Sequence, residues 1–173
     1  MDTRSLDTDL RRASRARCLG TIVLLTAAAL AAPAGPAAAA SPATREARTV
    51  MSSDTYEAKV ELLVNARRAH HGLRPLHFES CADMTAERWA ERVASTGDFV
   101  HQSSGAIIDA CRVTYAGETL GRGSFGPRAL VRSWMRSPMH RTVVLSPLAR
   151  RIGVGSDLDD SGQWVTSASF TRR

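Results

Sequence analysis

The segment from Trp134 to Gly155 constrains the fold most, because it contains a helix end, a histidine and a strand in close succession. A helical pattern of apolar residues ends at Ser137-Pro138, since the residue before a proline disfavours the helical conformation. His140 follows this break directly, and the Gly-x-Gly pattern from Gly153 to Gly155 belongs to a predicted strand. The chain must therefore place a histidine where a helix gives way to a sheet.

Two upstream features extend this segment into a candidate site. His101 and the Gly117-Glu118 pair precede it, each on a different predicted element. Two histidines and a carboxylate on separate elements are what a cleft able to hold a divalent metal requires. The histidines also have a plainer interpretation as surface or core residues, because they lack the i, i+4 spacing of a helical metal pair. Glu118 could accept backbone N–H bonds that fix its loop, or stabilise imidazolium and raise the pKa values of the histidines.

The order of elements predicts an α+β fold in which helices cover a sheet. A capping box at Asp54 and Glu57 predicts the start of the first helix, Pro127 opens the third helix at its first turn, and a turn sequence at 159–162 predicts a C-terminal hairpin. The elements expected are helices at 54–72, 80–97 and 127–137, short strands at 107–108 and 113–115, a glycine-rich loop at 121–126, a helical turn at 143–145, and hairpin strands at 151–158 and 163–170.

The N-terminal forty residues have the pattern of a secretory signal peptide. An arginine-containing polar segment, 1–17, precedes the apolar run 19–32, and small residues lead to Ala40. The apolar run is shorter than the ~20 residues of a membrane-spanning helix, although an uncleaved anchor is the alternative. We therefore expect a signal peptide at 1–40, a flexible lead-in at 41–53 and one domain at 54–173. The mature protein is expected to be secreted and not stably inserted in a membrane.

Composition favours an extracellular domain that does not bind nucleic acid. Removal of residues 1–40 leaves 133 residues, enough for one hydrophobic core. These contain 18 Arg and Lys against 14 Asp and Glu, and the arginines are scattered along the chain rather than gathered in a stripe. A scattered basic surface is typical of solvation rather than of nucleic-acid binding. Affinity for anionic envelope polymers or lipid head groups stays open.

The cysteines agree with export. Cys18 lies in the predicted signal peptide, which leaves Cys81 and Cys111, an even number in an oxidising compartment. We expect them to form a disulfide, with two buried free thiols as the alternative. Zinc binding by thiolates is not expected, because the chain lacks a C-x-x-C-like spacing.

A series of short motifs resembles one known family in number, order and spacing. The motifs are Leu63-Val64-Asn65-x-x-Arg68, Gly72-Leu73-x-Pro75-Leu76, Ala86-x-x-Trp89-Ala90, His101, Gly117-Glu118, Trp134-x-x-Ser137-Pro138-x-His140-Arg141 and Ile152-Gly153-Val154-Gly155. Together they resemble the CAP superfamily of cysteine-rich secretory, antigen 5 and pathogenesis-related proteins, in its bacterial, SCP-like branch. The resemblance covers about residues 57–170.

The resemblance implies an α-β-α sandwich with a central cleft lined by two histidines and two glutamates. His101, Glu118 and His140 match three of these four residues. Ser137 stands where the second glutamate is expected, and Thr119 replaces the asparagine that usually follows the first. In the family the two histidines can hold zinc, which makes His101 and His140 the expected metal ligands. Some members bind sterols or other lipids, and some have been proposed as proteases.

From these features we expect a non-catalytic extracellular binding protein for a lipid or cell-envelope ligand. The expected cleft contains His101, Glu118, His140 and Ser137. One alternative is a zinc-dependent hydrolase in which Glu118 acts as the base, and another is a structural or host-interaction protein with a vestigial cleft. A serine nucleophile at Ser137 is disfavoured, because Ser-Pro is an ordinary helix stop and no G-x-S-x-G elbow is present.

Overall fold

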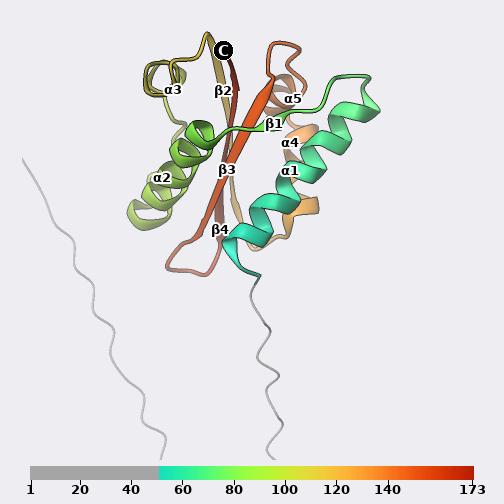
Figure 1. Ribbon diagram of the computed structural model, residues 1–173. Coiled ribbons are helices and arrows are strands. Elements are labelled where there is room, and N and C mark those ends of the chain that lie inside the picture. The colour runs from blue at the N-terminus through green and yellow to red at the C-terminus, as the bar shows by residue number, and fades with distance from the viewer. Residues whose placement is uncertain (1–50) are drawn as a thin grey trace, which may run out of the picture. The chain divides into compact units, whose positions relative to one another are not determined.

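The computed structural model describes residues 51–173 (Figure 1), so the predicted signal peptide and nearly all of the predicted lead-in lie outside the described residues. Five helices and four strands make up this part of the chain. In order they are α1 (Ser53–His70), β1 (His77–Phe78), α2 (Ser80–Thr96), α3 (Ser104–Cys111), β2 (Tyr115–Gly123), α4 (Pro127–Arg136), α5 (Pro138–Val144), β3 (Arg151–Leu158) and β4 (Trp164–Arg172).

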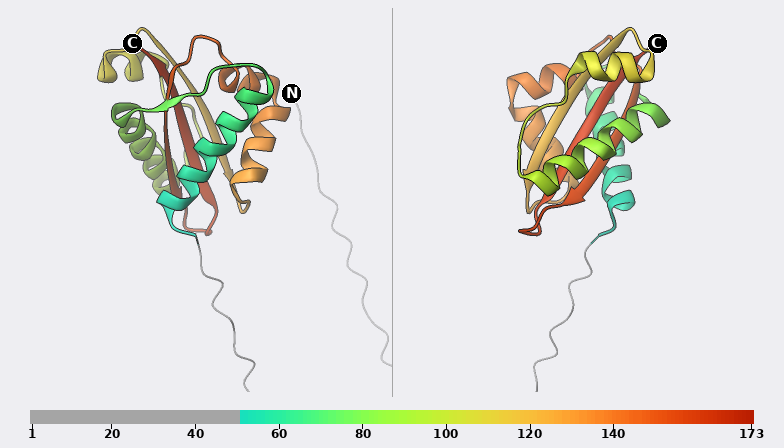
Figure 2. Two further views of the ribbon diagram at one scale, coloured as in Figure 1. Left: turned by 45° about the vertical axis from the view of Figure 1, so that its right-hand side comes forward. Right: turned by 90° about the vertical axis from the view of Figure 1, so that its left-hand side faces the viewer.

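The strands form one mixed sheet in the order β1-β3-β4-β2. β3 and β4 are the predicted hairpin, β2 pairs antiparallel with β4, and β1 adds only two residues parallel to β3. α2 and α3 cover one face, and α1, α4 and α5 cover the other (Figure 1, Figure 2). The predicted α-β-α sandwich is therefore confirmed, and β2, the strand that carries Glu118, forms one edge of the sheet.

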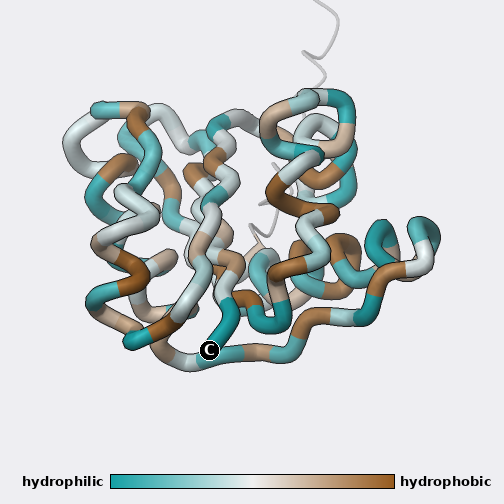
Figure 3. Tube along the Cα trace, turned by 90° about the horizontal axis from the view of Figure 1, so that it is seen from above, coloured by the Kyte–Doolittle hydropathy of each residue, from teal (hydrophilic) through white to brown (hydrophobic). Residues whose placement is uncertain are grey.

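The main hydrophobic core lies between the sheet and the three helices α1, α4 and α5. Trp134 of α4 is its largest fully buried side chain, and the indole N–H donates to the carbonyl of Leu120 at 3.1 Å. A smaller cluster, formed by Val93, Ala94, Leu120 and Val165, lies on the α2 face. In Figure 3, apolar residues recur between polar ones along the helices, as expected for helices that bury one side against a sheet.

α2 approaches β3 unusually closely, because β3 presents glycines to it. A Cβ atom at Gly153 would overlap the backbone of Asp83, and one at Gly155 would overlap the backbone of Glu87. The facing residues of α2 include the fully buried Ala82, Ala86 and Ala90. The Gly-x-Gly pattern is thus a packing requirement.

Several predicted boundaries are confirmed. α2 ends at Gly97, which has the left-handed φ of 79° that suits glycine. Pro127 begins α4, and β3 has the predicted bounds. Ser137 ends α4 with an extended conformation and at once precedes α5. His140 therefore lies within α5, which extends the predicted helical turn toward the N-terminus.

The segment 104–111 corrects the predictions most clearly. The expected short strand at Ile107–Ile108 is wrong, because these residues lie in α3. The Ser103 side chain accepts the N–H of Ala106 at the start of this helix, and Ile107 is completely buried against Cys111 and Val113. Capping and burial on one side override the strand preference of two β-branched residues.

Two further expectations differ from the structure. The glycine-rich segment expected to be a loop continues β2 as far as Gly123. The first helix is capped by the side chain of Ser52 rather than by Asp54, and the carboxylate of Glu57 accepts the N–H of Ser156 instead of closing a capping box. Within residues 51–173, none of the helices is both long and apolar enough to span a bilayer.

Candidate functional site

His101, Glu118 and His140 lie together beside the edge strand β2. His101 comes from the segment between α2 and α3, Glu118 from β2 and His140 from α5. The centroids of the two imidazole rings are 5.8 Å apart, and the rings are inclined at 51°. They line a cleft of about 340 Å³ together with Gln102, Ser104, Tyr115, Ala116, Gly117, Glu118, Met139 and Val143. The structure thus brings together three of the four residues expected in the cleft.

Glu118 is the buried centre of this arrangement, with 2% of its side chain exposed. One carboxylate oxygen, Oε2, lies 2.7 Å from Nδ1 of His101 and accepts the backbone N–H of Gln102 at 3.0 Å. The other, Oε1, accepts the hydroxyl of Ser167 at 2.7 Å. Hydrogen bonds to an ionised carboxylate are short and strong. Glu118 therefore fixes both the 101–102 backbone and the orientation of the His101 ring.

The two histidines have different surroundings. The side chain of His101 is 57% exposed, and its bond to Glu118 uses Nδ1, which leaves Nε2 for a ligand. His140 is half-buried, and burial, with a smaller contribution from the charge of His101, lowers its pKa. The alternative in which Glu118 raises the pKa values of both histidines therefore does not hold for His140, because the carboxylate bonds to His101. The lowered pKa favours the neutral imidazole of His140, which is the form that can bind a metal or accept a hydrogen bond.

Ser137 does not line the cleft. Its backbone N–H donates to the carbonyls of Ser133 and Trp134, and its carbonyl accepts the N–H of Arg141. The residue thus ends one helix and starts the next. Of the cleft-lining residues that the sequence analysis missed, Gln102 and Met139 are the direct neighbours of the two histidines, and Tyr115 and Val143 belonged to predicted elements. Gln102 and Met139 could have been found because each is adjacent in sequence to a predicted site histidine.

Buried Arg68 holds the helix that carries His140. Its guanidinium donates to the carbonyl of Val144, the last residue of α5, at 2.8 Å, and to the carbonyl of Ser146 at 3.0 Å. Further bonds reach the carbonyls of Arg74 and Ala149. Burial lowers the pKa of this guanidinium. A residue of α1 thereby anchors the C-terminal end of α5 and the loop that follows.

The comparison with known families agrees with this geometry. Residues 62–168 match the family model of CAP, described as the cysteine-rich secretory protein family. The chain belongs to the CAP family. A Bacillus subtilis relative, the uncharacterized protein YkwD, is 33% identical over 130 residues, which are 68% of this chain and 51% of the relative. This CAP chain thus spans about half the length of that relative.

Solved structures support the CAP fold. A cysteine-rich secretory protein of Staphylococcus aureus superimposes with a TM-score of 0.59 at 24% identity, over 72% of this chain and 41% of that one. An extracellular protein of Bacillus anthracis with an SCP domain gives 0.57 at 18%, over 70% and 41%. An outer surface protein of Borrelia burgdorferi gives 0.56 at 15%, over 66% and 90%. At these identities the likeness establishes the fold alone.

The CAP cleft offers the kinds of ligand that zinc prefers, but it offers fewer of them than most protein zinc sites have. Imidazole nitrogens are common zinc ligands, and Glu118 supports His101 as carboxylates support metal-bound histidines. Protein zinc sites usually have three or four protein ligands. Here Oε2 of Glu118, the oxygen beside the histidines, has both acceptor positions occupied, and Oε1 accepts the hydroxyl of Ser167. His101 and His140 could therefore hold a metal only in an open site completed by water or a ligand.

The predicted disulfide between Cys81 and Cys111 is confirmed, with the Cα atoms 5.6 Å apart. It links the first turn of α2 to the last residue of α3. Because His101 lies between the two cysteines in sequence, the disulfide closes the loop that carries one side of the cleft.

A second, larger pocket of about 400 Å³ lies between α1 and α4. Apolar Met51, Leu63 and Pro127 line it together with three cations, Lys59, Arg128 and Arg132, and with Gly126 and Ala129. The sequence analysis missed this pocket, because its residues come from two helices and are individually ordinary. Its combination of apolar lining and positive charge suits an anionic amphiphile.

Proposed function

We infer that this CAP protein is secreted and acts by binding, without catalysis, a lipid or cell-envelope ligand in the cleft of His101, Glu118 and His140. The observation that carries this proposal is the bonding of Glu118. A general base needs a free lone pair within reach of the proton that it removes. Glu118 is buried, its Oε2 beside His101 has both acceptor positions occupied, and its Oε1 is bonded to Ser167, so it serves to position His101.

The lining of the cleft supports an amphiphilic ligand. Met139 is 79% exposed at the rim, and Val143 and Tyr115 add apolar surface. The free ring nitrogens of the two histidines supply polar contacts beside this surface. The cationic pocket between α1 and α4 supports a lipid with an acidic group, as a second place for the same ligand.

Lipid extraction followed by mass spectrometry of the purified protein tests the proposal, with titration of a fluorescent long-chain fatty acid as the probe. We expect a His101→Ala/His140→Ala variant to weaken binding at least tenfold. Arg132→Glu serves as the matched variant of the other pocket. A loss in Arg132→Glu alone would move the ligand out of the cleft, and no bound lipid in any form would overturn the proposal.

Two other assays address the alternatives and the export. Turnover of an ester or peptide substrate that depends on zinc and disappears in His140→Ala would replace binding by hydrolysis. If the folded protein retains no lipid or envelope material, the structural or host-interaction role is favoured.

Secretion predicts that the intact mass of the protein from the culture medium corresponds to a chain that begins at Ser41.

A further inference from the structure

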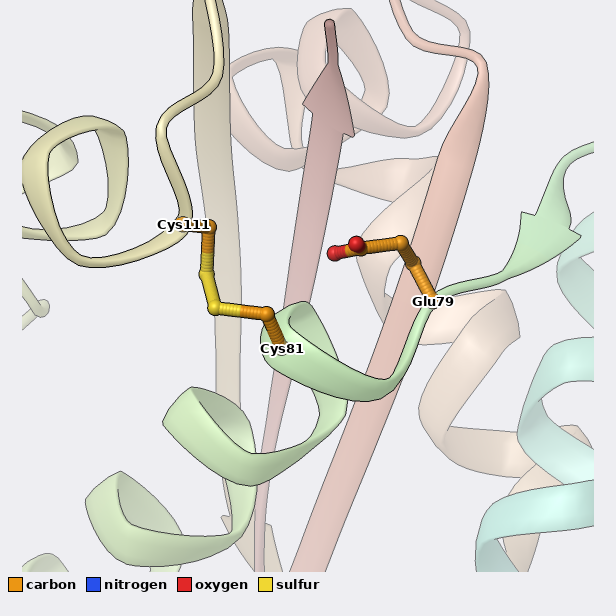
Figure 4. Close-up of side chains that lie close together, drawn as sticks. All are labelled: Glu79, Cys81 and Cys111. Carbon is orange, nitrogen blue, oxygen red and sulfur yellow. A yellow bond between two sulfur atoms is a disulfide. The ribbon is translucent and has the colours of Figure 1, made fainter.

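Glu79, Cys81 and Cys111 form a compact group that shares no residue with the histidine cleft (Figure 4). Glu79 lies between β1 and α2, and the cysteines lie at the start of α2 and the end of α3. A carboxylate oxygen and the two sulfurs are all within 4.8 Å of one another. Glu79 is 5% and Cys111 is 7% exposed, so this group lies largely inside the fold.

The carboxylate of Glu79 has partners that fix its position but do not saturate it. Oε2 accepts the backbone N–H of Ala82 at 3.1 Å, which caps α2. Oε1 accepts a guanidinium N–H of Arg173 at 3.0 Å. Each carboxylate oxygen has two lone-pair directions, so one acceptor position on each stays free. The Arg173 side chain is 66% exposed and can move away without disturbing the core.

We propose that reduction of the disulfide converts this group into a zinc site, with the thiolates of Cys81 and Cys111 and the carboxylate of Glu79 as ligands. A dithiol reductant supplies two electrons and two protons, which break the S–S bond and form two thiols, while the reductant becomes a disulfide. Zinc binding then releases the two thiol protons. The oxidised protein has no thiolate and does not bind zinc at this place.

The dimensions of the group suit this conversion. Zn–S bonds of ~2.3 Å and Zn–O bonds of ~2.1 Å place tetrahedral ligand atoms roughly 3.5–3.8 Å apart. The carboxylate oxygen lies within 4.8 Å of both sulfurs, so a rotation of the Glu79 side chain can bring it into that range, and the sulfurs reach it once their bond breaks. Helices hold both cysteines, so the thiolates stay adjacent. Two thiolates and a carboxylate are sufficient protein ligands for zinc, with a water in the fourth position.

The redox state of Cys81 and Cys111 depends on the cellular compartment. Thiols persist in a reducing environment and disulfides form in an oxidising one. The zinc form therefore belongs to the reducing side of a membrane and the disulfide form to the oxidising side. In both forms a cross-link joins α2 to α3, first through the metal and then through the S–S bond.

The test compares the oxidised and the phosphine-reduced protein. We expect this site to hold one zinc in the reduced chain and none in the oxidised chain. When Co²⁺ replaces zinc, the reduced chain should show a thiolate-to-metal charge-transfer band. Zinc should also raise the Tm of the reduced chain. Glu79→Gln should weaken zinc binding about tenfold or more, the scale on which even supporting partners of metal ligands act. Arg173→Ala should tighten it by removing a competing cation.

Two controls make the outcome decisive. Cys81→Ser/Cys111→Ser should lose the charge-transfer band, and His140→Ala should keep it. The proposal is overturned if reduced wild-type protein takes up no zinc, or if it unfolds while zinc is present, because the site requires the folded chain. Equal affinity in Glu79→Gln would remove the carboxylate from the ligand set and contradict the proposal as well.

Discussion

The carboxyl group of Glu57, on α1, is partly buried and has several acidic neighbours. The carboxylate of Glu57 accepts the N–H of Ser156 at 2.6 Å. Burial raises the pKa of Glu57 to about 7, the bond to Ser156 opposes this rise, and the nearby charges of Asp83, Glu87 and Asp54 add to it. The same carboxyl in an unfolded chain has the ordinary value of 4.5. Glu57 therefore binds a proton in the folded protein over a pH range in which the unfolded chain has released it.

The consequence is a loss of stability as pH rises from about 4.5 to about 7, because the folded state binds more protons there than the unfolded state. Glu57→Gln keeps an oxygen for the Ser156 N–H and removes the charge. We expect it to raise the free energy of unfolding by about 1 kcal/mol at pH 8, allowing for solvent screening of a partly exposed group, and to change it little below pH 4.5.

Urea denaturation at both pH values measures this effect. Asp109→Asn, an exposed acid on α3, is the matched control and should leave the difference between the two pH values unchanged. An equal effect of Glu57→Gln at both pH values would show that shape or hydrogen bonding, rather than charge, is responsible.

At the scale of elements, Arg68 connects α1 to the end of α5. Arg68→Met removes the donors for four carbonyls, and three of these bonds, to Arg74, Val144 and Ser146, are 3.0 Å or shorter. Buried carbonyls without partners cost about 1–3 kcal/mol each when water cannot replace the donor. We expect a loss of about 3–5 kcal/mol in urea denaturation, and partial recovery in Arg68→Lys. A loss below 1 kcal/mol would mean that water reaches these carbonyls.

The contact between α2 and β3 depends on glycine. Gly155→Ala would force a Cβ into the backbone of Glu87, which a flexible side chain cannot relieve. We expect a loss of about 3 kcal/mol or more, or failure to fold, measured by thermal or urea denaturation. Gly126→Ala is the matched control, because a Cβ there meets no atom within 4 Å, and it should change stability by less than about 0.5 kcal/mol. Equal effects of the two variants would contradict a packing role for Gly155.

The elements that could be predicted are those with strong local signals. The hairpin of β3 and β4 has an Asp-rich turn at 159–162, and Pro127 and Gly97 mark helix ends. The helix at 104–111 could not be predicted in this way, because Ile107 favours a strand locally and is helical for reasons of capping and burial. The same holds for Glu57, whose partner Ser156 is distant in sequence.

The candidate site shows a similar division. The convergence of His101, Glu118 and His140 was expected from the family resemblance, because those positions match its motifs. The exclusion of Ser137 from the cleft and the lowered pKa of His140 depend on side-chain positions and burial, which the sequence does not reveal.

For the whole molecule, the disulfide is the main covalent constraint in the described part of the chain. It closes a loop with a sequence separation of 30 residues that includes His101. Cys81→Ser/Cys111→Ser should lower the free energy of unfolding by ~3–4 kcal/mol in the loop-entropy model. Hydrogen exchange at the Gln102 amide, which bonds to Glu118, should become faster. Unchanged exchange there would mean that Glu118 alone holds the cleft segment.

The outer edge of β3 has a consequence for how the protein behaves in concentrated solution. Beyond the two residues paired with β1, the N–H groups of Val154 and Ser156 already bond to the carboxylates of Asp83 and Glu57. A strand from a neighbouring molecule would have to displace these two carboxyl acceptors before it could pair. These two acceptors therefore oppose growth of the sheet into fibrils through this edge, and replacing both acids with residues that have no acceptor would expose the N–H groups to a neighbouring strand.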